Sequence, residues 1–197
     1  MRHLSEVRVS PLRRLFHMAA GAGIPLVGLF VDHTVMVGLL AALVALAITL
    51  ETARFAAPGL NAWFVRWFRP CLKESESRKV TGSTYLAIGA LACFIFFDQR
   101  VAVPAMLFLA VGDPTAALVG RRAPGPRVWG KSPAGTLAFF AVAVAAVWGL
   151  ALGGHVEFRW ALVAGAAAAA LAELLPVPLD DNLTVPLAAG AVMTLVG

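Results

Sequence analysis

Charged residues are scarce in this sequence. Asp, Glu, Lys and Arg make up 14% of its 197 residues and hydrophobic residues make up 60%, whereas soluble proteins carry about 25% charged residues. The 12 prolines and 18 glycines lie among long apolar runs, which excludes a disordered chain, a collagen-like repeat and a coiled coil. The composition therefore predicts a polytopic membrane protein. Because each span needs roughly 20 residues, the chain has room for about seven or eight spans at most.

Cysteine and recognisable repeats are scarce as well. The two cysteines, Cys71 and Cys93, are far apart and form no CxxC pair, which excludes a disulfide framework and a cysteine metal site. No inverted repeat, which would favour a transporter, is visible. Residues 125–132 match the GxxxxGKS pattern of a P-loop, but no strand precedes them and Pro124 and Pro126 interrupt the pattern. A P-loop fold is therefore not expected.

Seven apolar segments are candidate membrane spans, and the predicted fold is all-α. They cover residues 16–31, 35–50, 83–97, 101–119, 134–152, 158–175 and 184–196. Together they predict a single membrane-embedded domain over 1–197, with an N-terminal segment over 1–15. The alanine-rich stretch 164–172 is typical of a close helix–helix interface, where small residues let two backbones approach.

The positions of the basic residues predict the topology. Fourteen of the 16 Lys and Arg residues fall in the N-terminus, the 51–82 loop and the 120–133 loop, and only Arg100 and Arg159 fall on the opposite side. This asymmetry places the N-terminus, both basic loops and the 176–183 loop in the cytoplasm and the C-terminus outside. The net charge of +5 therefore reflects topology, and no nucleic-acid partner is expected.

An aromatic and basic stretch follows the second predicted span. Trp63 and Trp67 lie four residues apart, as do Phe64 and Phe68, and basic residues alternate with them. The spacing predicts an in-plane interfacial helix over 57–72, because aromatic and basic side chains suit the surface of a bilayer. The alternative is a cytoplasmic extension of the second span.

Polar residues in such a chain are informative, because an ionisable group at membrane depth costs at least ~2.5 kcal/mol unless it faces protein or water. A first cluster holds Arg14, His17, Glu51 and Arg54, and its structural explanation is an ion pair between Glu51 and Arg54 at a helix end. A second cluster lies just before the third span and holds Glu74, Glu76, Arg78, Lys79, Ser83 and Thr84. It fits either an anion site, with Ser83 capping a helix, or a solvated charge run.

A third cluster is the single acid of the 101–120 run. Asp113 is followed by Pro114, and Asp at an N-cap with Pro at the next position is a strong signal for a helix start. The pattern predicts a broken helix whose second half begins at Asp113, with the break lining a polar cavity. A purely structural cap is the alternative.

Two further clusters lie in the last two cytoplasmic loops. Arg121, Lys131 and Ser132 precede a helix start at Pro133, where free N–H groups and Lys131 would attract a polyphosphate. The other cluster holds Glu173, Asp180, Asp181 and Asn182, which fit either helix caps or a Mg²⁺ site. Together the carboxylates and cations on one face of the membrane are the inventory of a Mg-nucleotide site for phosphoryl transfer.

Several short motifs occur in a fixed order. They are Lys-Glu-Ser-Glu from residue 73, Thr-Gly-Ser-Thr-Tyr from residue 81, Gly-Asp at 112–113 with 116–121, Gly-Lys-Ser at 130–132 with Gly-Thr at 135–136, Glu173, and Asp-Asn-Leu from residue 181. The set resembles the CTP-dependent lipid kinase family, the group of dolichol kinase, phytol kinase and yeast-type diacylglycerol kinase. The likeness runs from about residue 17 to the C-terminus. The longer dolichol kinases carry additional N-terminal spans that this sequence lacks, which argues against dolichol as the substrate.

The resemblance implies an enzyme of the cell (inner) membrane that uses CTP and a divalent cation such as Mg²⁺ to phosphorylate a lipid alcohol at the cytoplasmic face. On this reading the catalytic residues are Asp113, Asp181 and Lys131, with Asp113 favoured as the proton acceptor, and the metal ligands are Glu76, Asp113, Asp181 and Asn182. The phosphate-binding residues would be Arg78, Lys79, Ser83, Thr84, Arg121, Lys131 and Ser132. Further candidates are His17, Glu51, Arg54, Glu74, Glu173 and Asp180.

The sequence leaves several alternatives open. The lipid alcohol could be phytol, geranylgeraniol, a polyprenol or diacylglycerol, and a homodimer is neither indicated nor excluded. The family is more distantly similar to the CTP:phosphatidate cytidylyltransferases, so cytidylyl transfer to a lipid phosphate is a second hypothesis. A transporter or scaffold whose charges only set topology is a third.

Overall fold

The computed structural model describes residues 11–197, although the side chains of 11–17 and of Glu74 lie outside that description. Eight α-helices follow one another over this part of the chain: α1 (Pro11–Gly28), α2 (His33–Ala56), α3 (Pro58–Phe68), α4 (Gly82–Phe96), α5 (Gln99–Arg122), α6 (Pro133–Leu152), α7 (Trp160–Leu174) and α8 (Asp181–Val196). Two 3-10 turns, η1 (Arg69–Cys71) and η2 (Glu74–Ser77), connect α3 to α4. No strand occurs among the described residues, so the predicted all-α class is confirmed.

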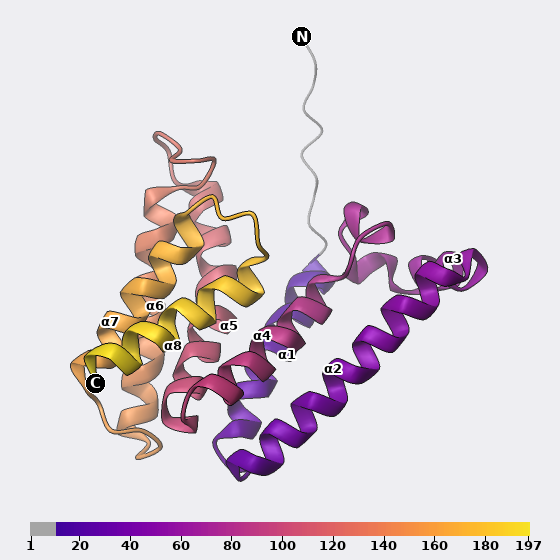
Figure 1. The fold of residues 1–197 in the computed structure, drawn as a ribbon. Helices are drawn as coiled ribbons and strands as arrows, with labels where there is room; N and C mark the ends of the chain where they lie inside the picture. The colour runs from indigo at the N-terminus through magenta and orange to yellow at the C-terminus, as the bar shows by residue number, and fades with distance from the viewer. Residues whose placement is uncertain (1–10) are drawn as a thin grey trace.

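Each of the seven predicted spans overlaps one apolar helix. Within the part of the chain whose side chains are described, α2, α5 and α6 are long and apolar enough to cross a membrane, and α1, α4, α7 and α8 contain shorter apolar stretches. The connections from α2 to α3, from α3 to α4, from α5 to α6 and from α7 to α8 lie at one end of the bundle, and those from α1 to α2, from α4 to α5 and from α6 to α7 lie at the opposite end (Figure 1). Both basic loops and the 176–183 loop therefore share one end, an arrangement that the predicted topology requires.

Helix α5 forms the centre of the bundle, where it packs against α1, α4, α6, α7 and α8. The side chains of Met106, Phe108 and Leu109 on α5 are fully buried, as are Phe94 on α4 and Phe139 on α6. Helix α2 lies at the periphery, packs mainly on α3 and α4, and exposes a long apolar face. The chemistry of the chain is therefore carried by helices around α5 and by the loops at one end of the bundle.

The expected helix break at Asp113 is wrong, because α5 runs without interruption through Asp113 and Pro114. Proline removes one backbone donor, but such a position is tolerated where neighbouring helices surround it. Gly112 brings α6 close at this level, since a Cβ there would lie 2.4 Å from the ring of Phe139. Tertiary packing therefore keeps α5 helical where the local sequence predicts a start.

Two predicted caps are also displaced. Thr81, not Ser83, is the N-cap of α4, and its hydroxyl accepts a hydrogen bond from the N–H of Thr84. Asp180, not Asp181 or Asn182, is the N-cap of α8, and its carboxylate accepts from the N–H of Asn182 at 3.0 Å. The consequence is that Ser83 and Asp181 are released from capping and line a cavity described below.

The aromatic stretch forms a helix of its own. Helix α3 begins at Pro58 and ends at Phe68, close to the predicted bounds, so it is not an extension of α2. The rings of Trp63 and Trp67 lie 6.5 Å apart and those of Phe64 and Phe68 lie 4.9 Å apart. Both tryptophans are exposed, which leaves an aromatic surface at the end of the bundle that carries the basic loops.

Small residues allow the close packing of α4 on α8. A Cβ added at Gly89 would lie 2.2 Å from the carbonyl oxygen of Asn182, so the two helices can approach this closely only because the residue is glycine. The predicted small-residue interface of α7 is confirmed in the same way, since a Cβ at Gly165 would lie 2.4 Å from the side chain of Met193 on α8. Helix α8, which carries Asp181 and Asn182, is thus positioned by glycines of two neighbouring helices.

Gly89→Ala is expected to destabilise the protein by about 1–3 kcal/mol, because the new methyl group overpacks the contact between α4 and α8. The matched control is Gly38→Ala on α2, where a Cβ would meet nothing within 4 Å; alanine there should be neutral or stabilising by up to ~1 kcal/mol. The midpoint of thermal unfolding in detergent measures both. Equal midpoints for the two variants would contradict this packing.

Candidate active site

A cavity of about 370 Å³ opens at the end of the bundle that carries the basic loops. Its walls come from the segment between α3 and α4, from the middle of α5, from the loop before α6 and from the connection between α7 and α8. Seven of the residues singled out from the sequence line it: Glu76, Ser83, Asp113, Lys131, Asp180, Asp181 and Asn182. Residues from four distant segments therefore meet in one place.

Lys131, in the loop before α6, joins the end of α7 to the start of α8. Its ammonium group lies 3.1 Å from Oδ2 of Asp181 and 3.2 Å from Oε1 of Glu173, and it also donates to the backbone carbonyl of Glu173. Burial of Lys131 lowers its pKa, but the two carboxylates outweigh this effect and raise the pKa above its usual range. The side chain therefore remains a cation at neutral pH and is held at the cavity wall.

Asp113 contributes a second carboxylate to the same cavity. It lies on α5, within electrostatic range of both Asp181 and Glu173. Asp113 thus adds a third carboxylate near the two that pair with the ammonium of Lys131, which leaves a local excess of negative charge. Such an arrangement is suited to bind a cation or to accept a proton.

Glu76 and Asn182 line the same cavity as Lys131. One oxygen of Glu76 accepts from the backbone N–H of Lys73 at 2.7 Å, and the other accepts from the N–H of Gly82 at 2.9 Å. The amide of Asn182 donates to the carbonyl of Gly82 at 3.2 Å and to Asp180 at 2.7 Å. Glu76 therefore joins the two ends of the segment before α4, and Asn182 holds the start of α4 against α8, in addition to any role toward a ligand.

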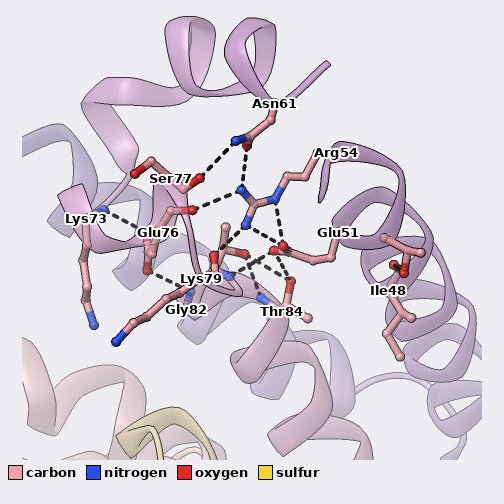
Figure 2. A network of polar contacts seen from close by, with 12 residues as sticks. Ile48, Glu51, Arg54, Asn61, Lys73, Glu76, Ser77, Lys79, Gly82 and Thr84 are labelled. Carbon is pink, nitrogen blue, oxygen red and sulfur yellow. Dashed lines mark hydrogen bonds and ion pairs between the residues drawn. The ribbon is translucent and has the colours of Figure 1, made fainter. Parts of the chain in front are cut away.

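The segment before α4 is also tied to α2 (Figure 2). The guanidinium of Arg54, only 2% exposed, pairs with Glu51 at 2.5 Å and donates to the carbonyl oxygens of Glu76 and Lys79 at 3.1 and 2.6 Å. The predicted ion pair of Glu51 and Arg54 is confirmed. The contacts to residues more than twenty positions away were not predicted, because a backbone carbonyl leaves no trace in the sequence.

The remaining predicted site residues with described side chains do not line the cavity. Arg78, Lys79 and Arg121 are exposed at the same end of the molecule. Thr84 is buried and its hydroxyl donates to Glu51 at 3.1 Å, and Ser132 is buried as the N-cap of α6. The side chains of His17 and Glu74 lie outside the described residues.

Sequence reasoning missed three parts of this arrangement. Lys73 lines the cavity, Asn61 joins α3 to Arg54, and the apolar stretch 175–179 forms one wall. Lys73 belongs to a charge run in which no spacing separates it from its neighbours. Pro176 and Pro178 favour a turn in this stretch, but proline carries no signal that a turn faces a cavity.

The donor set of the cavity is compatible with Mg²⁺ only if a ligand completes it. Among residues 11–197 with described side chains, no group of three His, Cys, Asp or Glu residues is placed to hold a metal ion. Mg²⁺ is usually bound by one or two carboxylates together with water and substrate phosphates. Asp113 and Asp181, which line the same cavity, meet that smaller requirement.

Known proteins provide an independent comparison. The chain is 29% identical over 171 residues to CTP-dependent diacylglycerol kinase 1 of Schizosaccharomyces pombe, which covers 76% of each chain. This similarity supports the resemblance to the CTP-dependent lipid kinase family. It is also 35% identical over 117 residues to a probable phytol kinase 3 of Glycine max, a match that covers 52% of this chain and 37% of the soybean protein.

The chain is also 26% identical over 135 residues to an uncharacterized protein of Rickettsia prowazekii, a match that covers 67% of this chain and 66% of that protein. No protein-family model matches the chain, and no solved structure matches it. The resemblance carried by the ordered motifs is therefore confirmed by the relatives' names, and the geometry of the cavity has to be interpreted from this chain alone.

Proposed function

We propose that this enzyme transfers the γ-phosphoryl group of CTP to the hydroxyl of a membrane lipid alcohol, with Mg²⁺, at the cytoplasmic face of the cell membrane. The observation that carries the proposal is the juxtaposition of Asp113, Asp181 and Lys131 in one cavity of a chain related to CTP-dependent lipid kinases. Phosphoryl transfer depends mainly on positioning and on neutralising negative charge, and these residues supply both.

The cavity residues have three proposed roles, which are to accept a proton, to bind phosphate and to hold a metal ion. Asp113 accepts the proton of the lipid alcohol while the alcohol oxygen forms a bond to the γ-phosphorus of CTP. The O–H bond of the alcohol and the bond between the γ-phosphorus and the bridging oxygen break, and CDP leaves. The ammonium group of Lys131 binds oxygens of the CTP phosphates, and these oxygens would compete with Asp181 for the ammonium group. A Mg²⁺ ion held by Asp113 and Asp181 would neutralise charge on the phosphates, with Glu76 and Asn182 in support.

The loop 175–179 supports a lipid as the acceptor. Leu175, Val177 and Leu179 are 44%, 40% and 56% exposed, yet they line the same cavity as the carboxylates. An apolar wall next to a polar one suits a molecule with a hydroxyl head and a hydrocarbon chain. We propose that this loop binds the part of the chain nearest the hydroxyl.

A test of the apolar wall replaces Val177 by threonine and Leu179 by asparagine. We expect the KM for the lipid alcohol to rise about tenfold, because polar groups would have to lose water against hydrocarbon. The KM for CTP should stay within twofold, which provides an internal control. A rise in the KM for CTP with an unchanged KM for the lipid alcohol would contradict the proposal that the apolar wall binds the lipid.

The membrane arrangement is part of the same proposal. All seven apolar helices would span the bilayer as one catalytic domain, with α3 lying in the plane of its cytoplasmic surface. Clustering of the basic loops at one end supports this orientation by the positive-inside rule, and α3 with its exposed tryptophans suits the interface. Cysteine-accessibility labelling of the two loop sets in intact cells tests the orientation.

The function is tested on purified protein in detergent with Mg²⁺, a panel of lipid alcohols, and CTP or ATP labelled at the γ or the α position. The proposal expects CDP and a phosphorylated alcohol that carries the γ label, with CTP preferred over ATP. Pyrophosphate and a lipid that carries the α label, formed from a lipid phosphate, would instead identify a cytidylyltransferase. No turnover with any acceptor would refute both enzymes.

A further inference from the structure

The buried polar network around Arg54 is not explained by helix packing alone. Its members come from three elements: Glu51 and Arg54 from α2, Asn61 from α3, and the segment 76–84 before and within α4 (Figure 2). Arg54, Glu51 and Thr84 are 2%, 8% and 5% exposed. A network this deeply buried at a loop has to be fully satisfied to be stable.

The network satisfies the backbone of one segment almost continuously. Arg54 donates to the carbonyls of Glu76 and Lys79, and the amide of Asn61 donates to the carbonyl of Ser77 at 3.0 Å. Glu51 accepts from the N–H of Thr81 at 2.9 Å. Four backbone groups between residues 76 and 81 are thereby fixed by side chains of α2 and α3.

Arg54 is itself held in place by its neighbours. Its Nε donates to Oε2 of Glu51 at 2.7 Å and its Nη1 donates to Oδ1 of Asn61 at 3.0 Å. The guanidinium also lies over the rings of Phe55 and Phe64, 4.1 and 5.1 Å from their centroids. Arginine suits this position because its planar group can donate in several fixed directions, which the ammonium of a lysine cannot reproduce.

The fixed segment is one wall of the candidate active site. Glu76, Gly82 and Ser83 line the cavity, whereas Glu51, Arg54 and Asn61 do not. We propose that Glu51, Arg54 and Asn61 are positioning residues. They act through the 76–82 segment, whose place in the cavity wall they fix, and this part of the wall binds the nucleotide. The inference rests on the proposed function. It adds that α3 is linked to the site through the hydrogen bonds of Asn61.

The first test compares Arg54→Lys with Arg159→Lys, an exposed arginine whose pairing with Glu157 is also exposed. For Arg54→Lys we expect the KM for CTP to rise at least tenfold while the KM for the lipid alcohol stays within twofold. Arg159→Lys should match the wild type in both. Equal losses toward both substrates, or no change in the KM for CTP, would overturn the proposal, because a purely structural residue lowers only the amount of folded enzyme.

The second test needs no substrate. Hydrogen exchange of the backbone amides of Thr81 and Gly82 should accelerate at least tenfold in Arg54→Lys, while amides in the middle of α5 and α7 exchange at the wild-type rate. Uniform acceleration over all helices, or no acceleration at 81 and 82, would overturn the proposal. Because this measurement is independent of turnover, it decides the role of Arg54 even if the wild type does not consume CTP.

A milder variant covers the case in which Arg54→Lys fails to fold. Asn61→Ala removes one contact to Arg54 and one to Ser77 and leaves the ion pair of Glu51 and Arg54 intact. We expect the KM for CTP to rise about threefold and exchange at 81 and 82 to accelerate by a smaller factor. Wild-type values in both measurements would overturn the link between α3 and the site.

Discussion

Asp113→Asn is expected to lower kcat by about 10²–10⁴-fold, the usual contribution of a positioned proton acceptor. Asparagine keeps the size and shape of the side chain, and α5 already continues through this position, so folding should be retained. Initial rates with saturating CTP and lipid alcohol measure the effect. A rate within threefold of the wild type would remove Asp113 from the catalytic machinery.

The matched control is Asp98→Asn, at the other end of the same helix. Asp98 is exposed, and as the N-cap of α5 it makes no side-chain capping bond, so the same chemical change should leave kcat within twofold. Titration of Mg²⁺ then separates the two roles proposed for Asp113. A lost proton acceptor lowers kcat at an unchanged half-saturating Mg²⁺ concentration, whereas a lost metal ligand raises that concentration.

Lys131→Ala is expected to have two effects, on stability and on nucleotide use. Removing the ammonium leaves Asp181 and Glu173 facing each other without compensation. Loss of one partner of a fully buried pair costs roughly 3–5 kcal/mol. Because Lys131 and Asp181 are about one third exposed, we expect a smaller loss of about 1–3 kcal/mol. The KM for CTP should rise at least tenfold, because a cation near the phosphates is lost.

The double variant Lys131→Ala with Glu173→Gln separates these effects. Neutralising Glu173 removes the repulsion between the two carboxylates and should restore most of the unfolding free energy. It cannot restore a cation, so the KM for CTP should remain high. If the double variant recovers both stability and nucleotide use, Lys131 is a structural ion-pair partner and not a phosphate ligand; Lys131→Arg is the charge-conserving reference.

The outcome for Lys131 illustrates how far local patterns reach. The sequence indicated Lys131 because it follows Gly130 and precedes a helix start, and that helix does begin at Pro133. Its partners Glu173 and Asp181 lie 42 and 50 residues away. Periodicity carries no information on such distant pairs, so the sequence could name the three residues but not join them.

Three exposed cations illustrate a different limit of sequence patterns. Arg78, Lys79 and Arg121 have the charge expected of phosphate ligands, but their side chains do not line the cavity. Charge type can be predicted from composition and spacing, whereas the direction of a side chain depends on how its loop is held. For Lys79 the loop is held by its own carbonyl, which accepts from Arg54.

The amino-acid sequence by itself determined that this protein is helical and apolar, where its helices lie within a few residues, and that its charged loops share one end. These properties follow from hydrophobic runs, turn residues and charge asymmetry, which act over a few neighbouring residues. Only the tertiary structure decided that α5 stays intact at Asp113, that Lys131 bridges two carboxylates, and that Arg54 fastens a distant loop. The first two features depend on how helices that are distant in the sequence pack together. The third depends on backbone carbonyls, which are the same for every residue type and therefore leave no pattern in the sequence.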